Sequence, residues 1–387
     1  MRNVKLKSIL VFNIQKIILT TSYNFHKMFS RHTRCGGWII GVSEICGLIH
    51  QMGLLANNSR TVCFTEDPFS PSLEYTFKLK PGKFWKYRRV LLGPYLLGSL
   101  LNQSEGFIYL SLDKFLLGTI DNGEYEFNFV KSKGKKLVLW FTGSDIRSIV
   151  RMKQTKVDRT EEDWSDIMPY LYSDILSTGY DDTKFAIASV ANRYANLILN
   201  NESDQVSYLS GPMRDTWQII EKSFFNFNNT KFDGLLEKDL VILHAPSNPV
   251  LKGTLLVNAA IARLRSEGYK FNYIELRNVS REDVNSKLRT AHIVLNQFYA
   301  RVPGHFGYEA MANCCVVLQS ADFEAKFEIN EPWVKTNTYQ IYDNLKLLLD
   351  DLGQCKRIAE QGYQYAVKKT HPDSLGFEIN KLLGSIA

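Results

Sequence analysis

Short apolar runs and runs of helical period alternate along the second half of the chain. Val257, Ile261 and Leu264 recur at the spacing of one helix face, which predicts an amphipathic helix. Apolar runs at 271–276 and 292–296 have the length of buried strands. Strands that alternate with helices in this way pack as a parallel sheet, so this half is predicted to be an α/β domain.

The first half of the chain shows the same alternation. Residues 1–21 combine a basic start with an apolar centre, and we interpret them as a first strand, with a targeting role as the weaker alternative. Gly36 and Gly37 precede a run of helical period at 38–52. Further buried strands are predicted at 61–64, 107–110 and 136–141, and a further helix at 185–199.

The length of the chain and a linker-like segment near its middle indicate two domains. A chain of 387 residues exceeds one ordinary core and suits two domains. Gly211 and Pro212, followed by the Asn- and Phe-rich segment 224–234, have the composition of a linker. We therefore predict an amino-terminal domain at 1–212, a carboxyl-terminal domain at 235–371 and a tail at 372–387.

Composition restricts the class of protein. A hydrophobic content of 45% with 22% charged residues is that of a soluble globular protein, and no apolar run is long enough to span a membrane. The six cysteines form no C-x-x-C pair, so we expect reduced core residues in a cytoplasmic protein rather than a zinc site or a disulfide framework. The net charge of +7 favours an anionic partner.

Polar residues gather where the predicted strands of the second half end. Ligands bind open parallel sheets in the crevice at the carboxyl ends of the strands, so 244–252 and 296–309 are expected to face one crevice. His244, at the very end of its strand, is more typical of a structural residue. The candidate site residues in these two segments are Ser247, Lys252, Gly304, Phe306, Gly307 and Glu309.

The order of motifs in this half carries a family resemblance. The chain reads H-A-P-S-N at 244–248, K-G-T at 252–254, and then a Gly-rich turn that leads into Y-E-A-M-A at 308–312. This series resembles the nucleotide-sugar half of a GT-B glycosyltransferase, most of all the large retaining family 4. The resemblance covers 241–371 well and 134–212 more loosely. It implies an α/β fold of two Rossmann-like parallel-sheet domains that face a cleft.

The resemblance also implies roles for the candidate residues. Glu309 would accept hydrogen bonds from ribose hydroxyls, Lys252 would place a cation on the diphosphate, and the helix that begins near Phe306 would add N–H groups. The donor would be a nucleotide-diphosphate sugar, with no cofactor and no metal, and the sugar would keep its anomeric configuration. The acceptor would be a glycan or a lipid-linked glycan in bacterial polysaccharide or glycolipid assembly. Without the motif, Glu309 would be a helix-terminal carboxylate and Lys252 a surface lysine.

One position departs from the family pattern. The family motif contains two glutamates that are eight positions apart. Glu309 matches the second glutamate, and the position of the first is occupied here by Arg301. Arg301 is therefore a candidate catalytic residue for an unusual donor, for example one with an acidic group. The same departure supports two rival hypotheses, which are a non-catalytic relic that binds sugar nucleotides and a nucleotide-sugar epimerase of the same fold.

The first half offers two candidate loops. Gly36 and Gly37 lie between a predicted strand and a predicted helix, where glycine lets backbone approach a donor phosphate or an acceptor; an ordinary loop is the alternative. The segment T-G-S-D-I-R follows the strand at 136–141 and places Asp145 as a second catalytic candidate, with Arg147 beside it. The structural alternative is that Asp145 caps a helix and pairs with Arg147.

The segment 78–89, KLKPGKFWKYRR, interleaves six cations with three aromatic residues. Such a segment can lie on an anionic membrane surface, clamp single-stranded nucleic acid, or form a solvated basic loop before a buried helix. Nucleic acid is the least favoured of the three. We therefore expect a cytoplasmic protein, with a peripheral position on the inner face of the cell membrane as the alternative.

Overall fold

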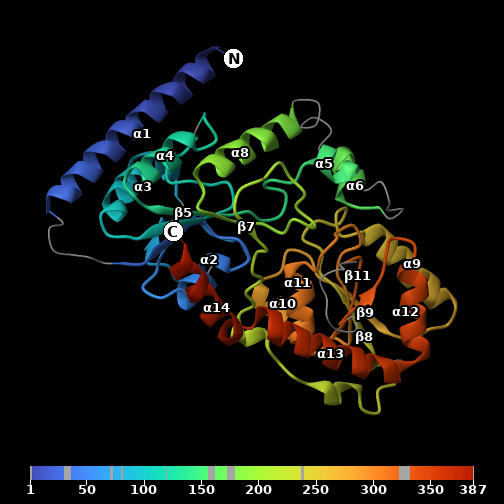
Figure 1. Ribbon diagram of the computed structural model, residues 1–387. Coiled ribbons are helices and arrows are strands. Elements are labelled where there is room, and N and C mark those ends of the chain that lie inside the picture. Colours follow the sequence, from blue (N-terminus) through green and yellow to red (C-terminus); the bar gives the residue numbers. More distant parts are fainter. Residues whose placement is uncertain are drawn as a thin grey trace. The chain divides into compact units, whose positions relative to one another are not determined.

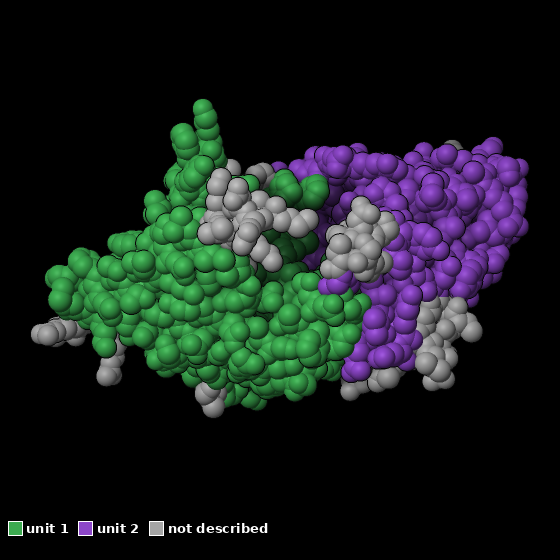
Figure 2. All heavy atoms as spheres, turned by 90° about the horizontal axis from the view of Figure 1, so that it is seen from above, with its two compact units in different colours: residues 1–148, 181–216, 376–387 green, residues 149–180, 217–375 purple. Residues whose placement is uncertain are grey.

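The computed structural model describes residues 2–29, 36–69, 73–79, 82–118, 120–155, 162–171, 179–236, 239–321 and 332–386. These residues form two compact units (Figure 2). Unit 1 comprises 1–148, 181–216 and 376–387, and unit 2 comprises 149–180 and 217–375. The segment 149–180, which we assigned to the first domain from the sequence, groups with unit 2 instead. The sequence-predicted tail groups with unit 1 from Gly376 onwards.

Unit 1 is built on a parallel sheet of seven strands in the order β3-β2-β1-β4-β5-β6-β7 (Figure 1). Its strands are β1 (Trp38–Ser43), β2 (Arg60–Thr65), β3 (Phe77–Lys78), β4 (Gly106–Leu110), β5 (Lys136–Trp140), β6 (Leu197–Leu199) and β7 (Met213–Arg214). Its helices are α1 (Arg2–Phe29), α2 (Leu48–Leu55), α3 (Trp85–Leu101), α4 (Glu124–Ser132) and α8 (Tyr180–Tyr194), and α14 (Pro372–Ser385) joins them at the end of the chain. The central strands β1 and β4 are buried along their whole length, which explains their continuous apolar sequences.

Three sequence predictions in unit 1 are wrong. The segment predicted as a first strand is helix α1. The segment 38–52, predicted as one helix, contains strand β1 and then the start of α2. The helix predicted at 185–199 ends at Tyr194, and its last residues form β6. In all three places a short apolar run is compatible with both a buried strand and a helix, and periodicity alone does not separate them.

Unit 2 is built on a parallel sheet of five strands in the order β12-β11-β10-β8-β9. Its strands are β8 (Val241–His244), β9 (Asn272–Glu275), β10 (Ile293–Leu295), β11 (Val316–Gln319) and β12 (Val334–Lys335). Its α-helices include α5 (Ile149–Gln154), α6 (Trp164–Leu171), α9 (Thr254–Ser266), α10 (Arg281–Leu288), α11 (His305–Ala312), α12 (Ile341–Asp350) and α13 (Leu352–Thr370), and two 3-10 turns lie at Lys222–Phe224 and Asn229–Phe232.

Most sequence predictions in unit 2 are confirmed. Helix α9 buries Val257, Ile261 and Leu264, and the strands at 271–276 and 292–296 are β9 and β10. The chain leaves α11 through Asn313, which has an ordinary negative φ of −97°, whereas the next residue, Cys314, has a left-handed φ of 56°.

Together, the two sheets give the architecture that the resemblance implied, since each unit is a parallel sheet covered by helices. Each unit also has its own hydrophobic core. In unit 1 the core includes Ile39, Val62 and Phe107, and in unit 2 it includes Ile242, Ile293 and Val316.

Candidate functional site

Strands β8 and β10 are neighbours at the place where the sheet of unit 2 reverses its order. The chain continues from β8 to β9 on one side and from β10 to β11 on the other. His244 and Leu295 pair at the carboxyl ends of these two strands. An open parallel sheet leaves a crevice at such a switch point, and the loops after both strands line it.

Lys252 connects the two loops at this crevice. Its Nζ donates a hydrogen bond to the side-chain oxygen of Gln297, which follows β10. Gln297 in turn donates to the carbonyl oxygen of Val302, at 3.0 Å. The cation is therefore held at the switch point, and its role toward a diphosphate stays a prediction. Ser247, another candidate, is exposed on the loop after β8.

His244 is a structural residue of the same strand end. Its ring is buried, with Nδ1 2.7 Å from the carbonyl oxygen of Leu295 and Nε2 2.9 Å from the hydroxyl of Thr254. Burial lowers the pKa of His244 to about 4, so the ring is neutral and ties β8 to β10 and to α9. This agrees with the structural role suggested by its place in the sequence.

Two glycines let helix α11 begin against the edge of the sheet. A Cβ at Gly307 would lie 2.6 Å from the side-chain nitrogen of Asn296 and 2.7 Å from the side-chain oxygen of Gln319. A Cβ at Gly304, the N-cap residue, would lie 3.0 Å from the amide of Gln297. These glycines therefore permit close packing beneath the start of the helix.

The first turn of α11 carries backbone N–H groups of the kind that bind anions. The amides of Gly307 and Tyr308 bond to the carbonyl oxygen of Gly304. Within the part of the chain that the structure describes, the amides of His305 and Phe306 have no hydrogen-bond partner. Unpaired N–H groups and the positive end of a helix dipole favour an anion at this place.

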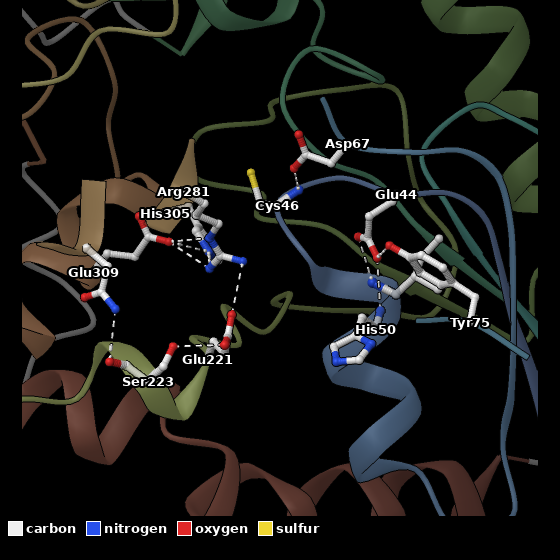
Figure 3. Close-up of polar contacts among 12 residues, drawn as sticks. Glu44, Cys46, His50, Asp67, Tyr75, Glu221, Ser223, Arg281, His305 and Glu309 are labelled. Carbon is white, nitrogen blue, oxygen red and sulfur yellow. Dashed lines mark hydrogen bonds and ion pairs between the residues drawn. The ribbon is translucent and has the colours of Figure 1, made fainter. Parts of the chain in front are cut away.

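Glu309 projects from the same helix and is held by Arg281 (Figure 3). Its Oε1 accepts hydrogen bonds from Arg281 at 2.7 Å and 3.0 Å and lies 3.4 Å from Nε2 of His305. Burial raises the pKa of this carboxyl, but the bonds from His305 and Arg281 outweigh that effect, so the pKa lies below its ordinary value. Among the described residues nothing donates a hydrogen bond to Oε2, which leaves that oxygen for a ligand.

Sequence reasoning missed the partners that orient Glu309. Arg281 is the first residue of α10, after the Ser280 cap whose hydroxyl accepts from the amide of Asp283. Nothing in the local sequence indicates that Arg281 reaches across to α11. Gln218, 3.2 Å from Nδ1 of His305, was missed for the same reason.

Arg301 lies in a buried ion pair and not on an open surface. Its Nε donates to Asp163 at 3.0 Å, Nη1 donates to Thr155 at 3.1 Å, and Nη2 donates to the carbonyl oxygen of Met152 at 3.3 Å. Arg301 and Asp163 are each about 5% exposed or less. This arginine therefore fastens the segment around α5 and α6 to the rest of unit 2, and its catalytic role stays a prediction.

In unit 1 the glycine pair lies at the other end of the strand from the place we predicted. Gly36 and Gly37 precede β1, so they lie at its amino end, whereas ligands approach parallel sheets at the carboxyl ends. A Cβ at Gly37, whose φ is 114°, would lie 1.9 Å from the carbonyl oxygen of Asn58. The position requires glycine for packing, and the ligand role predicted for this pair has no support in its geometry.

The loop at the carboxyl end of β1 is instead organised by Glu44 (Figure 3). Its carboxylate accepts hydrogen bonds from the amides of Ile45, Ile49 and His50, at 2.8 to 3.1 Å, and from the hydroxyl of Tyr75, at 2.9 Å. Burial raises the pKa of Glu44 even though these donors lower it. An internal carboxylate thus occupies the start of α2, the place where a phosphate binds in many nucleotide-binding folds.

Asp145 is part of the loop after β5. One oxygen accepts from Ser111 at 3.0 Å and the other from the backbone of Thr142 at 3.0 Å. Burial raises its pKa. Arg147 pairs with the buried carboxylate of Asp204, so the predicted Asp145–Arg147 pair is not the partnership found here. The catalytic assignment of Asp145 stays a prediction.

Comparison with known proteins bears on the fold. No family model matches the sequence, and a search of curated proteins found no match. Solved structures do match. HepE of Anabaena, solved with UDP-glucose, has a TM-score of 0.58 at 12% identity, over 90% of this chain and 100% of that chain. Sucrose-phosphate synthase of Thermosynechococcus elongatus has a TM-score of 0.60 at 11% identity, over 91% and 98%.

This chain has the GT-B fold. WaaG, a glycosyltransferase involved in lipopolysaccharide biosynthesis, is a further GT-B match with a TM-score of 0.52 at 11% identity, over 89% of this chain and 99% of that chain. The GT-B architecture predicted from the motifs is therefore confirmed. Membership of the retaining family 4 stays a prediction, because identities this low establish the fold alone.

Proposed function

We propose that the protein is a glycosyltransferase that moves a sugar from a nucleotide-diphosphate donor to a glycan or lipid-linked glycan acceptor. In this proposal unit 2 holds the donor and unit 1 the acceptor. The presence of UDP-glucose in the HepE structure supports a donor of the same class here. The proposal includes retention of configuration, no metal requirement, and a cytoplasmic role in polysaccharide or glycolipid assembly.

One observation carries the donor assignment. Lys252, the first amides of α11 and Glu309 all belong to the loops and helix that follow β8 and β10 at the switch point. A nucleoside diphosphate needs a cation and N–H donors for its phosphates and an acceptor for its ribose hydroxyls. Lys252, the amides of His305 and Phe306, and Oε2 of Glu309 supply these three functions.

Arg281 has a positioning role in this scheme. It occupies Oε1 of Glu309 and so fixes the orientation of the carboxylate while the other oxygen stays available. Together with His305, whose effect is the larger, Arg281 opposes the effect of burial and lowers the pKa of Glu309. An ionised carboxylate is the stronger acceptor for ribose hydroxyls.

Calorimetry with nucleotides tests the donor site directly. A hydrogen bond to a charged group contributes about 1.5–3 kcal/mol, so Glu309→Ala is expected to weaken UDP or GDP binding by roughly ten- to a hundredfold. Lys252→Ala should weaken binding of the diphosphates and have little effect on the bare nucleosides. The exposed residues Glu282 and Lys287 provide matched controls, since their alanine variants remove the same charges outside the proposed site. The absence of nucleotide binding by the folded wild type would refute the assignment.

A non-catalytic relic is the second candidate, and Arg301 is the observation in its favour. The position where the family has a carboxylate carries a cation committed to Asp163. Incubation with a panel of nucleotide sugars distinguishes the possibilities. Release of nucleoside diphosphate that increases with a glycan acceptor supports the transferase, whereas binding without release supports the relic. Isomerisation of the donor sugar without an acceptor supports an epimerase.

Two further measurements address the finer parts of the proposal. Nuclear magnetic resonance of the product reports the anomeric configuration of the new linkage, which should equal that of the donor. Activity should persist after treatment with a chelator. Inversion of the configuration, or loss of activity that divalent cations restore, would contradict the corresponding part of the proposal.

A further inference from the structure

Helix α1 is fixed to unit 1 along one face. Phe12 and Leu19 are buried in the core, and the side chain of Gln15 both donates to and accepts from the backbone of Leu117, at 2.8 Å each. The helix lies against α3 (Figure 1). Ser22 donates to the carbonyl oxygen of Tyr95 in α3 at 2.7 Å. One face of α1 is thus fully occupied by contacts within the unit.

The opposite face of α1 carries a series of exposed apolar side chains, which the exposed polar residues Thr21 and Asn24 interrupt. Its members recur at helical spacing, half a turn away from Phe12 and Leu19. Leu10 is 61% exposed, Ile17 is 66% exposed and Met28 is 59% exposed. The set is completed by Ile14 and Phe25, with Ile9 and Phe29 at its margins. An apolar stripe along several turns of a surface helix marks a binding surface, because water disfavours its exposure.

Helix α3 extends this surface. Phe84, Tyr87, Leu91 and Tyr95 are exposed large side chains at or near its first half. Lys83, Lys86 and Arg88 are exposed among them. Aromatic and basic side chains at the margin of an apolar surface are typical of proteins that lie in the interface of a bilayer.

Only part of the basic segment 78–89 is available for contact with a membrane surface. Arg89 is only 1% exposed and its Nη2 donates to the carbonyl oxygen of Lys114 at 2.7 Å, so it does not face outwards. Lys78 forms an ion pair with Glu66 at 3.3 Å. Residues 80 and 81 lie outside the described residues. The segment 78–89 as a whole is therefore not a continuous surface strip.

The positive charge of α1 and α3 favours an anionic partner. Among the side chains of α1 and α3 that the structure describes, the cations that are at least partly exposed are Lys16, Lys27, Lys86 and Arg88. Neither helix contains an aspartate or a glutamate. A second copy of this chain would bring like charges together on this face. An anionic bilayer offers complementary charge and an apolar interior for the stripe.

We propose that the exposed face of α1, together with Lys83, Lys86 and Arg88 beside the start of α3, docks the protein on the surface of an anionic lipid bilayer. The docking is parallel to the surface, because the exposed apolar side chains are distributed along the axis of α1. Within the described residues none of the helices has the length and apolar character needed to span a bilayer. The stripe of α1 enters the acyl boundary and the cations contact headgroup phosphates. The residues of this surface belong to unit 1, whereas those of the proposed nucleotide site belong to unit 2.

Sedimentation of the whole protein with vesicles tests the docking. The wild type should sediment with vesicles of phosphatidylglycerol and phosphatidylcholine in equal parts, and much less with phosphatidylcholine alone. The double variant Leu10→Asp, Ile17→Asp should bind at least about tenfold more weakly, because two apolar contacts are replaced by charges that the surface repels. Each of the single variants Lys83→Gln, Lys86→Gln and Arg88→Gln should weaken vesicle binding by about fivefold, because each removes one cation from the surface. Added salt should also weaken vesicle binding of the wild type, because it screens the attraction between the cations and the anionic lipids.

Matched variants make the result specific. Leu54→Asp and Leu347→Asp alter leucines that are 68% and 63% exposed on α2 and α12, and they should leave vesicle binding unchanged. Circular dichroism checks that all variants are folded. No sedimentation of the wild type, equal binding to neutral vesicles, or equal loss in the control variants would overturn the proposal. So would a wild-type dimer that Leu10→Asp, Ile17→Asp converts to a monomer, since the face would then be a self-association surface.

Discussion

At the scale of single residues, the pair of Arg281 and Glu309 is the most sensitive part of unit 2. Arg281→Met leaves a buried carboxylate without its cation, which typically costs about 3–5 kcal/mol of stability. Adding Glu309→Gln to this variant should restore much of the loss. Chemical denaturation of both single variants and the double variant gives the coupling between the two side chains, and additive effects would show that they are not coupled.

The same pair has a defined pH dependence. The pKa of Glu309 is lowered in the folded protein, so its contribution to stability is present above the ordinary carboxyl pKa and is lost as the pH falls through the folded value. In Arg281→Met burial is no longer opposed by that charge, so the pKa of Glu309 should rise. As the pH falls, Glu309 is then protonated at a higher pH in the variant than in the wild type, and protonation removes the unfavourable buried charge. The difference in stability between wild type and Arg281→Met should therefore shrink as the solution is acidified.

His244 gives a second residue-scale prediction. Because burial lowers its folded pKa to about 4, the unfolded chain takes up a proton first as the pH falls below about 6.5. Its contribution to stability is complete above that pH and is lost between about 6.5 and 4, by roughly 3 kcal/mol in all. Denaturation curves of His244→Gln should show a flatter dependence in this range than the wild type. Parallel curves would mean that the ring is not held neutral.

The candidate site could be predicted from the sequence only in part. Lys252 and Glu309 were predicted because each follows a strand that the apolar pattern marks clearly and because each lies in a motif of the resemblance, and both stay candidates. Arg281 and Gln297 were not found, because their roles depend on which loops meet at the crevice and not on their neighbours in sequence. Arg301 shows the converse, since its place in the motif suggested a donor contact and its buried partner Asp163 lies far away in the chain.

At the scale of elements, the contact between α1 and α3 depends on a glycine. A Cβ at Gly98 would lie 2.7 Å from Cβ of Ser22 and 2.7 Å from the amide nitrogen of Tyr23. Gly98→Ala should therefore push the helices apart and destabilise the protein by about 1–3 kcal/mol, although alanine is the better helix former. Gly376→Ala in α14 is the matched control, since its Cβ would make only an ordinary contact of 3.7 Å with Leu55. That variant should be as stable as the wild type or slightly more stable, and equal destabilisation by both changes would contradict the packing argument.

The apolar pattern of the sequence was sufficient to predict some helices and strands and not others. In α9 the apolar residues lie on one face and the polar residues on the other, so the period of 3.6 was readable. In α1 apolar residues lie on two opposite faces, one in the core and one exposed, and this distribution hides the period. The buried strand β1 has no alternation because both of its faces are covered, and it was merged with the helix that follows.

At the scale of the whole molecule, two sheets with separate cores suggest two unfolding transitions. Ligand that binds only the folded state stabilises the unit that holds it, by about 2.7 kcal/mol at a concentration one hundred times the Kd. For a unit of this size that corresponds to roughly 5–10 °C in Tm. The proposed donor site lies within unit 2, so UDP should raise the transition of that unit and leave the other unchanged.

Variants assign the transitions in a calorimetric scan. Gly98→Ala alters the packing of α1 on α3 and should lower only the transition of unit 1. His244→Gln alters the strand end beside the crevice and should lower only that of unit 2. With the assignment made, Lys252→Ala should greatly reduce the shift that UDP causes, because the cation at the switch point of β8 and β10 no longer meets the diphosphate. A shift by UDP of the transition that Gly98→Ala lowers would place the nucleotide in unit 1, and the donor site would then have to be sought at the carboxyl ends of β1 and β4.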